Sequence, residues 1–280
     1  MNRRDFLNFS KALAVTSAVS PLLASIDKKS TSNQPNKENT KDSLFYGSNS
    51  SFTDEDYKLS KEDYKLTLSV LHKLNVVQSL VGYGNFNTIS FDEVLQIQMK
   101  YRKAEKFTNA EFDYIEKMFY MDPSVFGFYG KRTVYSITNI IPKKEIIKIS
   151  HSGHFLYKEQ AVSTFNKIIK DVKSDIGHSV KLTSGVRNVP KQMRLFFNKI
   201  KHTKGDIVKA SESLAPPAYS YHSVGDFDVG KIGWGYKNFT ARFSFTPEFR
   251  AIRKLKYVGI RYTINNRDGV RFEPWHIKLI

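Results

Sequence analysis

The chain has 280 residues, a formal net charge of +17 and no cysteine. This length allows one large domain or two modest ones, each with a buried core. The lack of cysteine excludes disulfides and thiolate metal sites, so any zinc must be held by His, Asp or Glu. The positive charge would suit nucleic-acid binding, but the lysines are scattered and no nucleic-acid motif is present. The charge would favour attraction to anionic wall or membrane surfaces, or it reflects a Lys-rich composition.

Residues 1–25 are typical of an export signal. Arg3 and Arg4 precede an apolar stretch of small residues over 12–24, shorter than the ~20 residues that a membrane-spanning helix needs. The arginine pair, followed by Phe and Leu, resembles a twin-arginine signal, which exports an already folded protein. We therefore predict a location in the periplasm or cell envelope, away from nucleic acid.

The next two regions differ in composition. Residues 26–51 are rich in Lys, Ser, Asn and Thr and have too few apolar side chains to offset the entropy of ordering, which predicts a flexible linker. Residues 52–150 predict a mainly helical N-terminal region. Two capping-box pairs indicate helix starts within it: Ser90 with Glu93, and Thr108 with Glu111.

Residues 151–280 have an α+β pattern. Apolar residues at helical spacing predict a helix over about 162–176 that ends at Gly177. A short strand is predicted over Val180 to Leu182, and a second helix has Pro190 in its first turn.

The C-terminal segment predicts a hairpin. Tyr257 to Thr263 and Val270 to Ile280 have the composition of two strands, joined through Asn265, Asn266 and Asp268-Gly269. This places the last segment inside a small antiparallel sheet.

Candidate metal ligands occur in two segments, 216–229 and 272–276. A catalytic zinc site takes three protein ligands and leaves one position open. Together the segments supply His222, Asp226 or Asp228, His276 and a spare carboxylate, Glu273. A lone histidine is more often an ordinary surface or core residue, and we keep that interpretation for five others: His72, His151, His154, His178 and His202.

Three ordered motifs carry a family resemblance: Ser184-Gly185-Val186-Arg187, the segment 220–225, and Glu273-Pro274-Trp275-His276. They resemble the M15 family of zinc D-alanyl-D-alanine carboxypeptidases, the VanY-like group. The resemblance implies that residues 151–280 form a Hedgehog/DD-peptidase-like zinc peptidase domain, with a small antiparallel sheet and flanking helices.

The resemblance also implies roles for individual residues. His222 and His276 would be zinc ligands, and Glu273 would be the catalytic general base. Arg187 would act in catalysis and bind the terminal carboxylate of the substrate, to which a planar guanidinium can make two parallel hydrogen bonds; a structural salt bridge is its alternative role. Gln192 and Ser220 would lie at the substrate.

The third ligand departs from the family pattern. The family places an aspartate seven residues after the first histidine, but position 229 is valine and the aspartates stand at 226 and 228. Aligning the following Val-Gly selects Asp228 and implies a one-residue deletion. Asp226 remains the alternative, because side chains alternate along a strand and both aspartates would share one face.

Glu273 and His276 impose a geometric condition. Residues three apart point to opposite faces of a regular strand, so both can reach one site only if the strand is broken there. Pro274 cannot donate to a strand ladder and favours such a break.

The leading functional hypothesis is a zinc-dependent peptidase that removes the terminal D-amino acid of peptidoglycan stem peptides during cell-wall remodelling. The alternatives are a peptidoglycan endopeptidase or an L,D-carboxypeptidase of the same fold, or a non-catalytic wall-binding protein, for which the shortened spacing before Asp228 is the main support. Peripheral association with an anionic wall or membrane surface would fit the charge.

Overall fold

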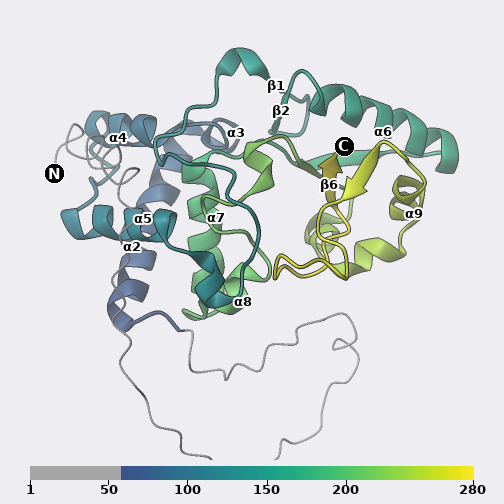
Figure 1. Cartoon of the computed structure of the whole chain (residues 1–280). Helices are drawn as coiled ribbons and strands as arrows, with labels where there is room; N and C mark the ends of the chain where they lie inside the picture. The colour runs from purple at the N-terminus through teal and green to yellow at the C-terminus, as the bar shows by residue number, and fades with distance from the viewer. Residues whose placement is uncertain (1–57) are drawn as a thin grey trace, which may run out of the picture.

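The computed structural model describes residues 58–280, and the predicted signal (1–25) and linker (26–51) lie outside these residues. A helical body and a sheet body lie side by side (Figure 1), and the candidate site is at their junction. Within residues 58–280, none of the helices combines the length and apolar character that crossing a bilayer requires.

The helical body is built from four helices of the N-terminal region: α2 (Lys61–Val81), α3 (Tyr83–Phe86), α4 (Phe91–Lys100) and α5 (Asn109–Tyr120). Both predicted capping boxes are present and begin α4 and α5. Their apolar faces meet in one core that includes Phe86, Phe91 and Phe119, each fully buried.

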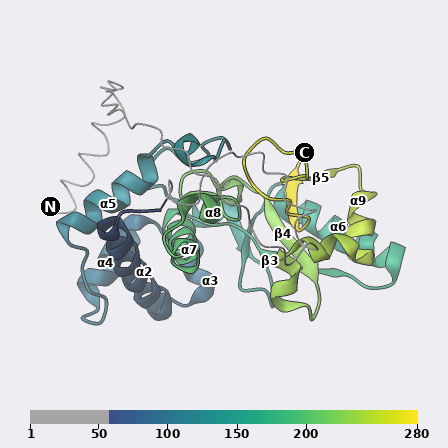
Figure 2. The same cartoon turned by 90° about the horizontal axis from the view of Figure 1, so that it is seen from below.

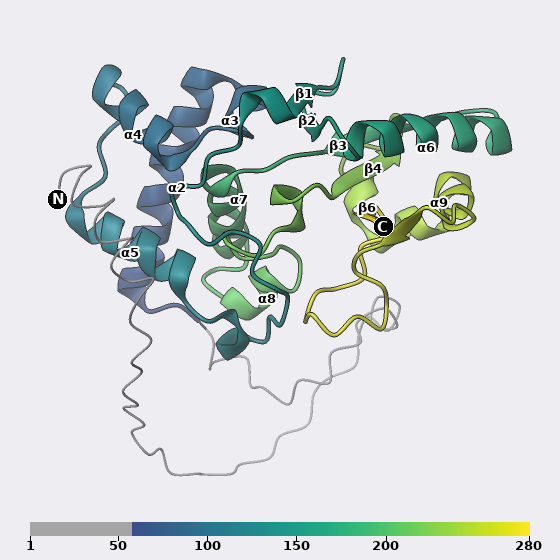
Figure 3. The ribbon, with the colours of Figure 1, turned by 45° about the horizontal axis from the view of Figure 1, so that its top comes forward.

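Two helices from the C-terminal half complete this body. Helices α7 (Val189–His202) and α8 (Ile207–Ser211) belong to the predicted peptidase region but share the core of α2 to α5, as Figure 2 and Figure 3 show for α7 beside α2. In addition, β1 (Ile146–Lys148) pairs with β2 (Phe155–Tyr157). The predicted boundary at 150/151 therefore falls inside a hairpin and does not separate two packing units.

The sheet body contains four antiparallel strands in the order β3-β4-β6-β5. The strands are β3 (Val180–Ser184), β4 (Phe227–Lys231), β5 (Val258–Ile260) and β6 (His276–Leu279). Helices α6 (Ala161–Ile176) and α9 (Pro247–Arg253) pack on this sheet and close its core. As predicted, α6 ends at Gly177, which has the left-handed φ of 79°, and the last segment lies inside the sheet.

The C-terminal strands are shorter than predicted. Residues 261–275 form a long connection between β5 and β6, where the sequence predicts strands joined by a tight turn. The connection folds back onto the helical body, because Arg271 N donates to Glu212 O (2.8 Å) and Tyr129 N donates to Asp268 O (2.9 Å). Arg261 N still donates to His276 O and Glu273 N to Tyr262 O (both 3.0 Å), and beyond these two bonds the long-range contacts replace the ladder of a regular hairpin.

Short 3₁₀ helices complete the described chain: η2 (Pro123–Phe126), η3 (Lys143–Glu145), η4 (Tyr221–Ser223), η5 (Gly235–Phe239) and η6 (Ala241–Phe245). Of these, η4 carries a candidate ligand, His222, directly before β4.

Candidate metal centre

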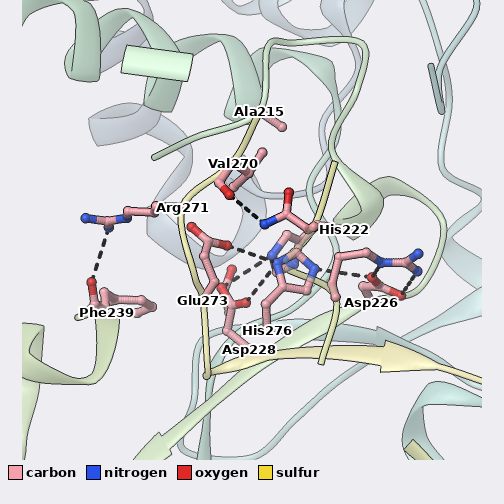
Figure 4. Close-up of polar contacts among 12 residues, drawn as sticks. Ala215, His222, Asp226, Asp228, Phe239, Val270, Arg271, Glu273 and His276 are labelled. Atoms are coloured by element: carbon pink, nitrogen blue, oxygen red, sulfur yellow. Dashed lines mark hydrogen bonds and ion pairs between the residues drawn. The ribbon is translucent and has the colours of Figure 1, made fainter. Parts of the chain in front are cut away.

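Three buried side chains converge at the end of the sheet that faces the helical body (Figure 4). His222 comes from η4, Asp228 from β4, and His276 is the first residue of β6. Asp228 and His276 are paired directly across the two strands. One ligand atom from each of the three residues lies within 4.8 Å of the other two. The structure thus brings together the three residues that the sequence proposes as ligands.

The turn after β3 holds His222 in place. An added Cβ at Gly185 would collide with the Phe155 carbonyl oxygen, so this turn requires glycine. The Gly185 carbonyl lies 2.9 Å from His222 Nδ1. Because a carbonyl can only accept, Nδ1 carries the proton and Nε2 keeps its lone pair free. Burial and the nearby Arg187 guanidinium lower the pKa of His222 to about 4, which keeps the ring neutral.

His276 is oriented from behind by a carboxylate. Its Nε2 lies 3.2 Å from Asp226 Oδ2, while its Nδ1 lies 3.4 Å from Glu273 Oε2 and 3.7 Å from Asp228 Oδ1. Burial lowers the pKa of His276, but the hydrogen bonds to Asp226 and Glu273 outweigh burial and raise it to about 9. The Nδ1 atom therefore faces the cluster, and Nε2 faces away from it.

Asp226 and Asp228 have different environments. Arg261 binds Asp226 with two hydrogen bonds, Nε to Oδ2 at 2.6 Å and Nη2 to Oδ1 at 3.0 Å. Asp228 instead lies between the two imidazoles, with its Oδ2 3.3 Å from His222 Nε2. The geometry favours Asp228 as the metal-facing carboxylate and makes Asp226 the support of His276.

The donor set fits zinc. Within residues 58–280, Asp228 Oδ1 is buried without a hydrogen-bond partner. Burial raises the pKa of Asp228, yet His222, His276 and Arg187 outweigh burial and keep it well below its usual range. An ionised carboxylate with an orphan oxygen, next to two imidazole rings, is a ligand set that zinc prefers, and a zinc ion at this place would displace the Nδ1 proton of His276.

Glu273 meets the geometric condition set by the sequence. It lies before β6 in a turn that His276 N closes by donating to Glu273 O at 3.1 Å. The predicted break near Pro274 is confirmed. The Glu273 side chain thus reaches the same site as His276 and lines the adjoining cavity.

A cavity of about 320 Å³ opens beside the three ligands. It is lined by Arg187, Gln192 and Ser220, as the proposed roles require, and also by Lys191, Tyr83 and Tyr262, which the sequence did not indicate. Arg187 is largely engaged: its Nε donates to Ser184 Oγ (2.9 Å), Nη1 to Gln192 Oε1 (3.4 Å) and Nη2 to Asp228 Oδ2 (2.9 Å).

Sequence reasoning also missed Arg261. It identified Asp226 as an alternative ligand, but two charged residues 35 positions apart give no local signal that they pair. The second aspartate in the shortened loop was the available signal. The site needs only one acidic ligand, so the other carboxylate is available to a different partner.

Comparisons with known proteins show what this chain is similar to. Residues 154–280 match the family model VanY, D-alanyl-D-alanine carboxypeptidase. A structure of VanYB in complex with D-alanine-D-alanine is 23% identical, with a TM-score of 0.38, over 50% of this chain and 81% of that one. A zinc-bound mutant of the vancomycin-resistance D,D-pentapeptidase VanY is 19% identical, with a TM-score of 0.37, over 55% and 88%. No curated protein sequence gave a significant match.

Proposed function

We propose that the protein is a zinc peptidase that removes the terminal D-amino acid of peptidoglycan stem peptides, on the premise that residues 154–280 match the family model VanY, D-alanyl-D-alanine carboxypeptidase. The observation that carries the proposal is the buried cluster of His222, Asp228 and His276, with the Glu273 carboxylate in the wall of the same cavity.

The site residues divide into those that would bind the metal and one that transfers a proton. His222 Nε2, His276 Nδ1 and a carboxylate oxygen of Asp228 would hold the zinc. When bound, zinc polarises the scissile carbonyl and makes a water molecule acidic enough to react near neutral pH. Glu273 is not needed as a ligand, so its carboxylate accepts the proton of the attacking water and returns it to the leaving amine nitrogen.

Arg187 has a structural role, because it binds Asp228. Its guanidinium holds Asp228 Oδ2 at 2.9 Å and thereby fixes the carboxylate in its ionised, metal-facing position. The guanidinium also lines the cavity, with two of its five N–H donors left after the three bonds described. We propose that these donors, with Gln192 and Ser220, position the peptide beside Glu273.

The test separates chemistry from metal binding. Glu273→Gln keeps the size of the side chain but removes the base, so zinc binding should persist while release of the terminal residue falls by roughly 10²- to 10⁴-fold. Zinc affinity is measured by chelator competition, and products from defined stem peptides are read by mass spectrometry.

The outcomes distinguish the alternatives. Full turnover by the Glu273→Gln variant would refute the assigned base. Internal cleavage by the zinc-loaded wild type would indicate an endopeptidase, and release of a residue from an L,D-linked bond only would indicate the L,D-carboxypeptidase. Absence of any product from the wild type would favour the non-catalytic wall-binding protein.

We also propose that the protein is exported to the periplasm or cell envelope, where its substrate lies and where its positive charge would favour anionic surfaces. The support is the sequence of residues 1–25. Replacing Arg3 and Arg4 together by lysine should retain the protein in the cytoplasm if the signal is of the twin-arginine type. Cell fractionation measures this, and unchanged export of the double variant would refute that route.

A further inference from the structure

Lys191 is a buried cation that the proposed mechanism does not use. It lies on α7 with 2% of its surface exposed, next to Gln192 in the wall of the catalytic cavity. Among residues 58–280, no carboxylate lies within ion-pair distance of its ammonium group. The polar contact of Nζ is a hydrogen bond of 3.5 Å to Gln78 Oε1, at the limit of such bonds.

Tyr83 provides the second contact of Lys191. The Nζ atom lies 4.1 Å from the centroid of the Tyr83 ring, a favourable cation–π distance. Tyr83 begins α3 and Gln78 is on α2, so both come from the N-terminal helical region, outside residues 154–280 that match the family model. The helical region therefore contributes to the wall of the cavity.

Burial of this cation without a counter-ion is unfavourable. A buried ammonium is normally paired with a carboxylate, because burial removes its hydration. Burial and the charges of Arg187 and Arg194 lower the pKa of Lys191 to about 7. A negatively charged group placed in the cavity would provide the missing partner.

Arg187 is less able to bind a negatively charged group of the substrate than its family role suggests. Its positive charge is already balanced by Asp228, with Nη2 at 2.9 Å from Oδ2. Lys191 has three N–H donors, of which one is directed to Gln78. Among residues 58–280, Lys191 is thus a fully buried positive charge of the cavity wall without a balancing carboxylate, whereas Arg271, which also lines the cavity, is only half-buried and donates Nη2 to Phe239 O at 3.3 Å.

We propose that Lys191, supported by Tyr83 and Gln78, is a specificity-determining residue that binds a carboxylate of the peptide substrate. The proposal rests on the proposed peptidase function and adds the helical region to the substrate site. Two carboxylates have the required chemistry: the C-terminal carboxylate of the peptide, or an acidic side chain one or more residues before it.

The experiment measures binding in the zinc-loaded Glu273→Gln protein, where turnover is suppressed. The probes are a stem peptide with both carboxylates free, its C-terminal amide and its side-chain amide, together with N-acetyl-D-alanine and N-acetyl-D-alaninamide. Each is titrated by calorimetry with and without Lys191→Met. The carboxylate that Lys191 contacts is the one whose amidation removes the effect of the substitution.

We expect Lys191→Met to weaken binding of the matching acid by roughly 10- to 100-fold, the usual strength of a hydrogen bond to a charged group. Binding of the matching amide should not change. Lys191→Arg should restore part of the affinity for the acid. Tyr83→Leu should weaken binding of the acid but not of the amide. Lys201→Met removes a charge from an exposed position of the same helix and should have no effect.

Folding and metal binding serve as controls. Replacing an unpaired buried cation by methionine should keep or raise the melting temperature, and zinc affinity should match the parent. Equal affinity of Lys191 and Lys191→Met proteins for every acid would overturn the subsite, while release of D-amino acid by the wild type would still support the peptidase. Conversely, Lys191-dependent binding of N-acetyl-D-alanine without any peptide cleavage would support the subsite and refute the peptidase.

Discussion

Asp226 and Asp228 stand two residues apart, and the structure gives them different roles. Asp228 faces both imidazoles and has an orphan oxygen, whereas Asp226 is held by Arg261 behind His276. A carboxylate that binds the far nitrogen of a ligating histidine fixes its orientation without touching the metal. The two aspartates should therefore differ in how strongly they affect zinc binding.

We predict that Asp226→Asn weakens zinc binding by about 10- to 100-fold, the usual effect of removing such a support. Asp228→Asn should weaken it further, because it removes a ligand. Arg261→Met should weaken zinc binding to a similar extent as Asp226→Asn, because it removes the side chain that holds the Asp226 carboxylate. Chelator competition measures all three affinities, and a larger loss with Asp226→Asn than with Asp228→Asn would reverse the two assignments.

The pH dependence of acid binding provides a second prediction for Lys191. Its pKa is lowered from 10.5 to about 7, so the free protein loses the positive charge as pH rises through 7. The dissociation constant of N-acetyl-D-alanine should then increase by roughly tenfold per pH unit above 7. Of the facing groups, His154 stays neutral over this range, because burial and Arg187 lower its pKa to about 4, and arginine side chains are not deprotonated in proteins.

Lys191→Arg is the matched control, because a guanidinium remains protonated throughout this range. Its affinity for N-acetyl-D-alanine should change little between pH 7 and 9. A wild-type curve as flat as that of the arginine variant would contradict binding of the terminal carboxylate by Lys191, and the same titration with the stem peptide would then test the acidic side chain.

At the level of single residues, sequence predicted those that stand in local motifs. His222, Glu273 and His276 lie in short segments whose order is informative by itself, and the structure brings them together. Lys191 gave no such signal, since a lysine on a predicted helix is ordinarily solvent-exposed. Its burial depends on docking of Tyr83 from more than a hundred residues earlier, which no local pattern encodes.

The contact between α2 and α5 contains a buried ion pair. Lys73 Nζ lies 2.6 Å from Glu111 Oε2, and both side chains are less than a tenth exposed. Glu111 also accepts from Ser69 Oγ and from Thr108 N, the latter as part of the capping box of α5. Burial raises the pKa of Glu111, but the bonds to Lys73, Ser69 and Thr108 outweigh it and lower the pKa below 4.5.

We predict that Glu111→Gln lowers the free energy of unfolding by about 3 to 5 kcal/mol, because it leaves the Lys73 charge buried without a partner. A carboxyl whose pKa is lowered by folding stabilises the protein above its unfolded pKa and loses this effect as pH falls through its folded pKa. The difference between wild type and variant should therefore shrink below pH 4.5. Urea denaturation of the full chain between pH 3 and 7 measures it.

An exposed pair between the same two helices is the control. Lys117 Nζ lies 2.8 Å from Asp63 Oδ2, but the lysine side chain is 56% exposed. Solvent screens such pairs, so Asp63→Asn should cost less than about 1 kcal/mol. Equal losses from Asp63→Asn and Glu111→Gln would mean that burial does not strengthen the inner pair.

Helix starts were predictable at this scale, but strand lengths were not. A capping box is complete within four residues, so Ser90 and Thr108 indicate α4 and α5 without further context. The connection between β5 and β6 has the composition of strands, yet its backbone is held by Glu212 and Tyr129 of the helical body. Tertiary hydrogen bonds override β propensity there.

At the scale of the molecule, the family match and the packing divide the chain differently. The match begins at residue 154, but α7 and α8 of the matched part bury their apolar residues against α2 to α5. On α7 the shared residues are Val189, Met193, Phe196, Phe197 and Ile200, each no more than 1% exposed. Sequence similarity marks the part that carries the ligands, whereas burial marks the unit that folds.

We predict that residues 151–280 alone do not fold stably, although they contain all three proposed zinc ligands. Without α2 to α5 the apolar face of α7 would be exposed to water, at about 1.5 to 3 kcal/mol for each large side chain, and β2 would lose its partner β1. The matched control is a chain that begins at residue 58 and contains both bodies. It should unfold cooperatively and bind zinc, while the shorter chain should aggregate or show no cooperative transition. A soluble, monomeric 151–280 chain with the zinc affinity of the longer one would show that the sheet body holds the metal site independently, and that the helical region serves only the substrate side of the cavity.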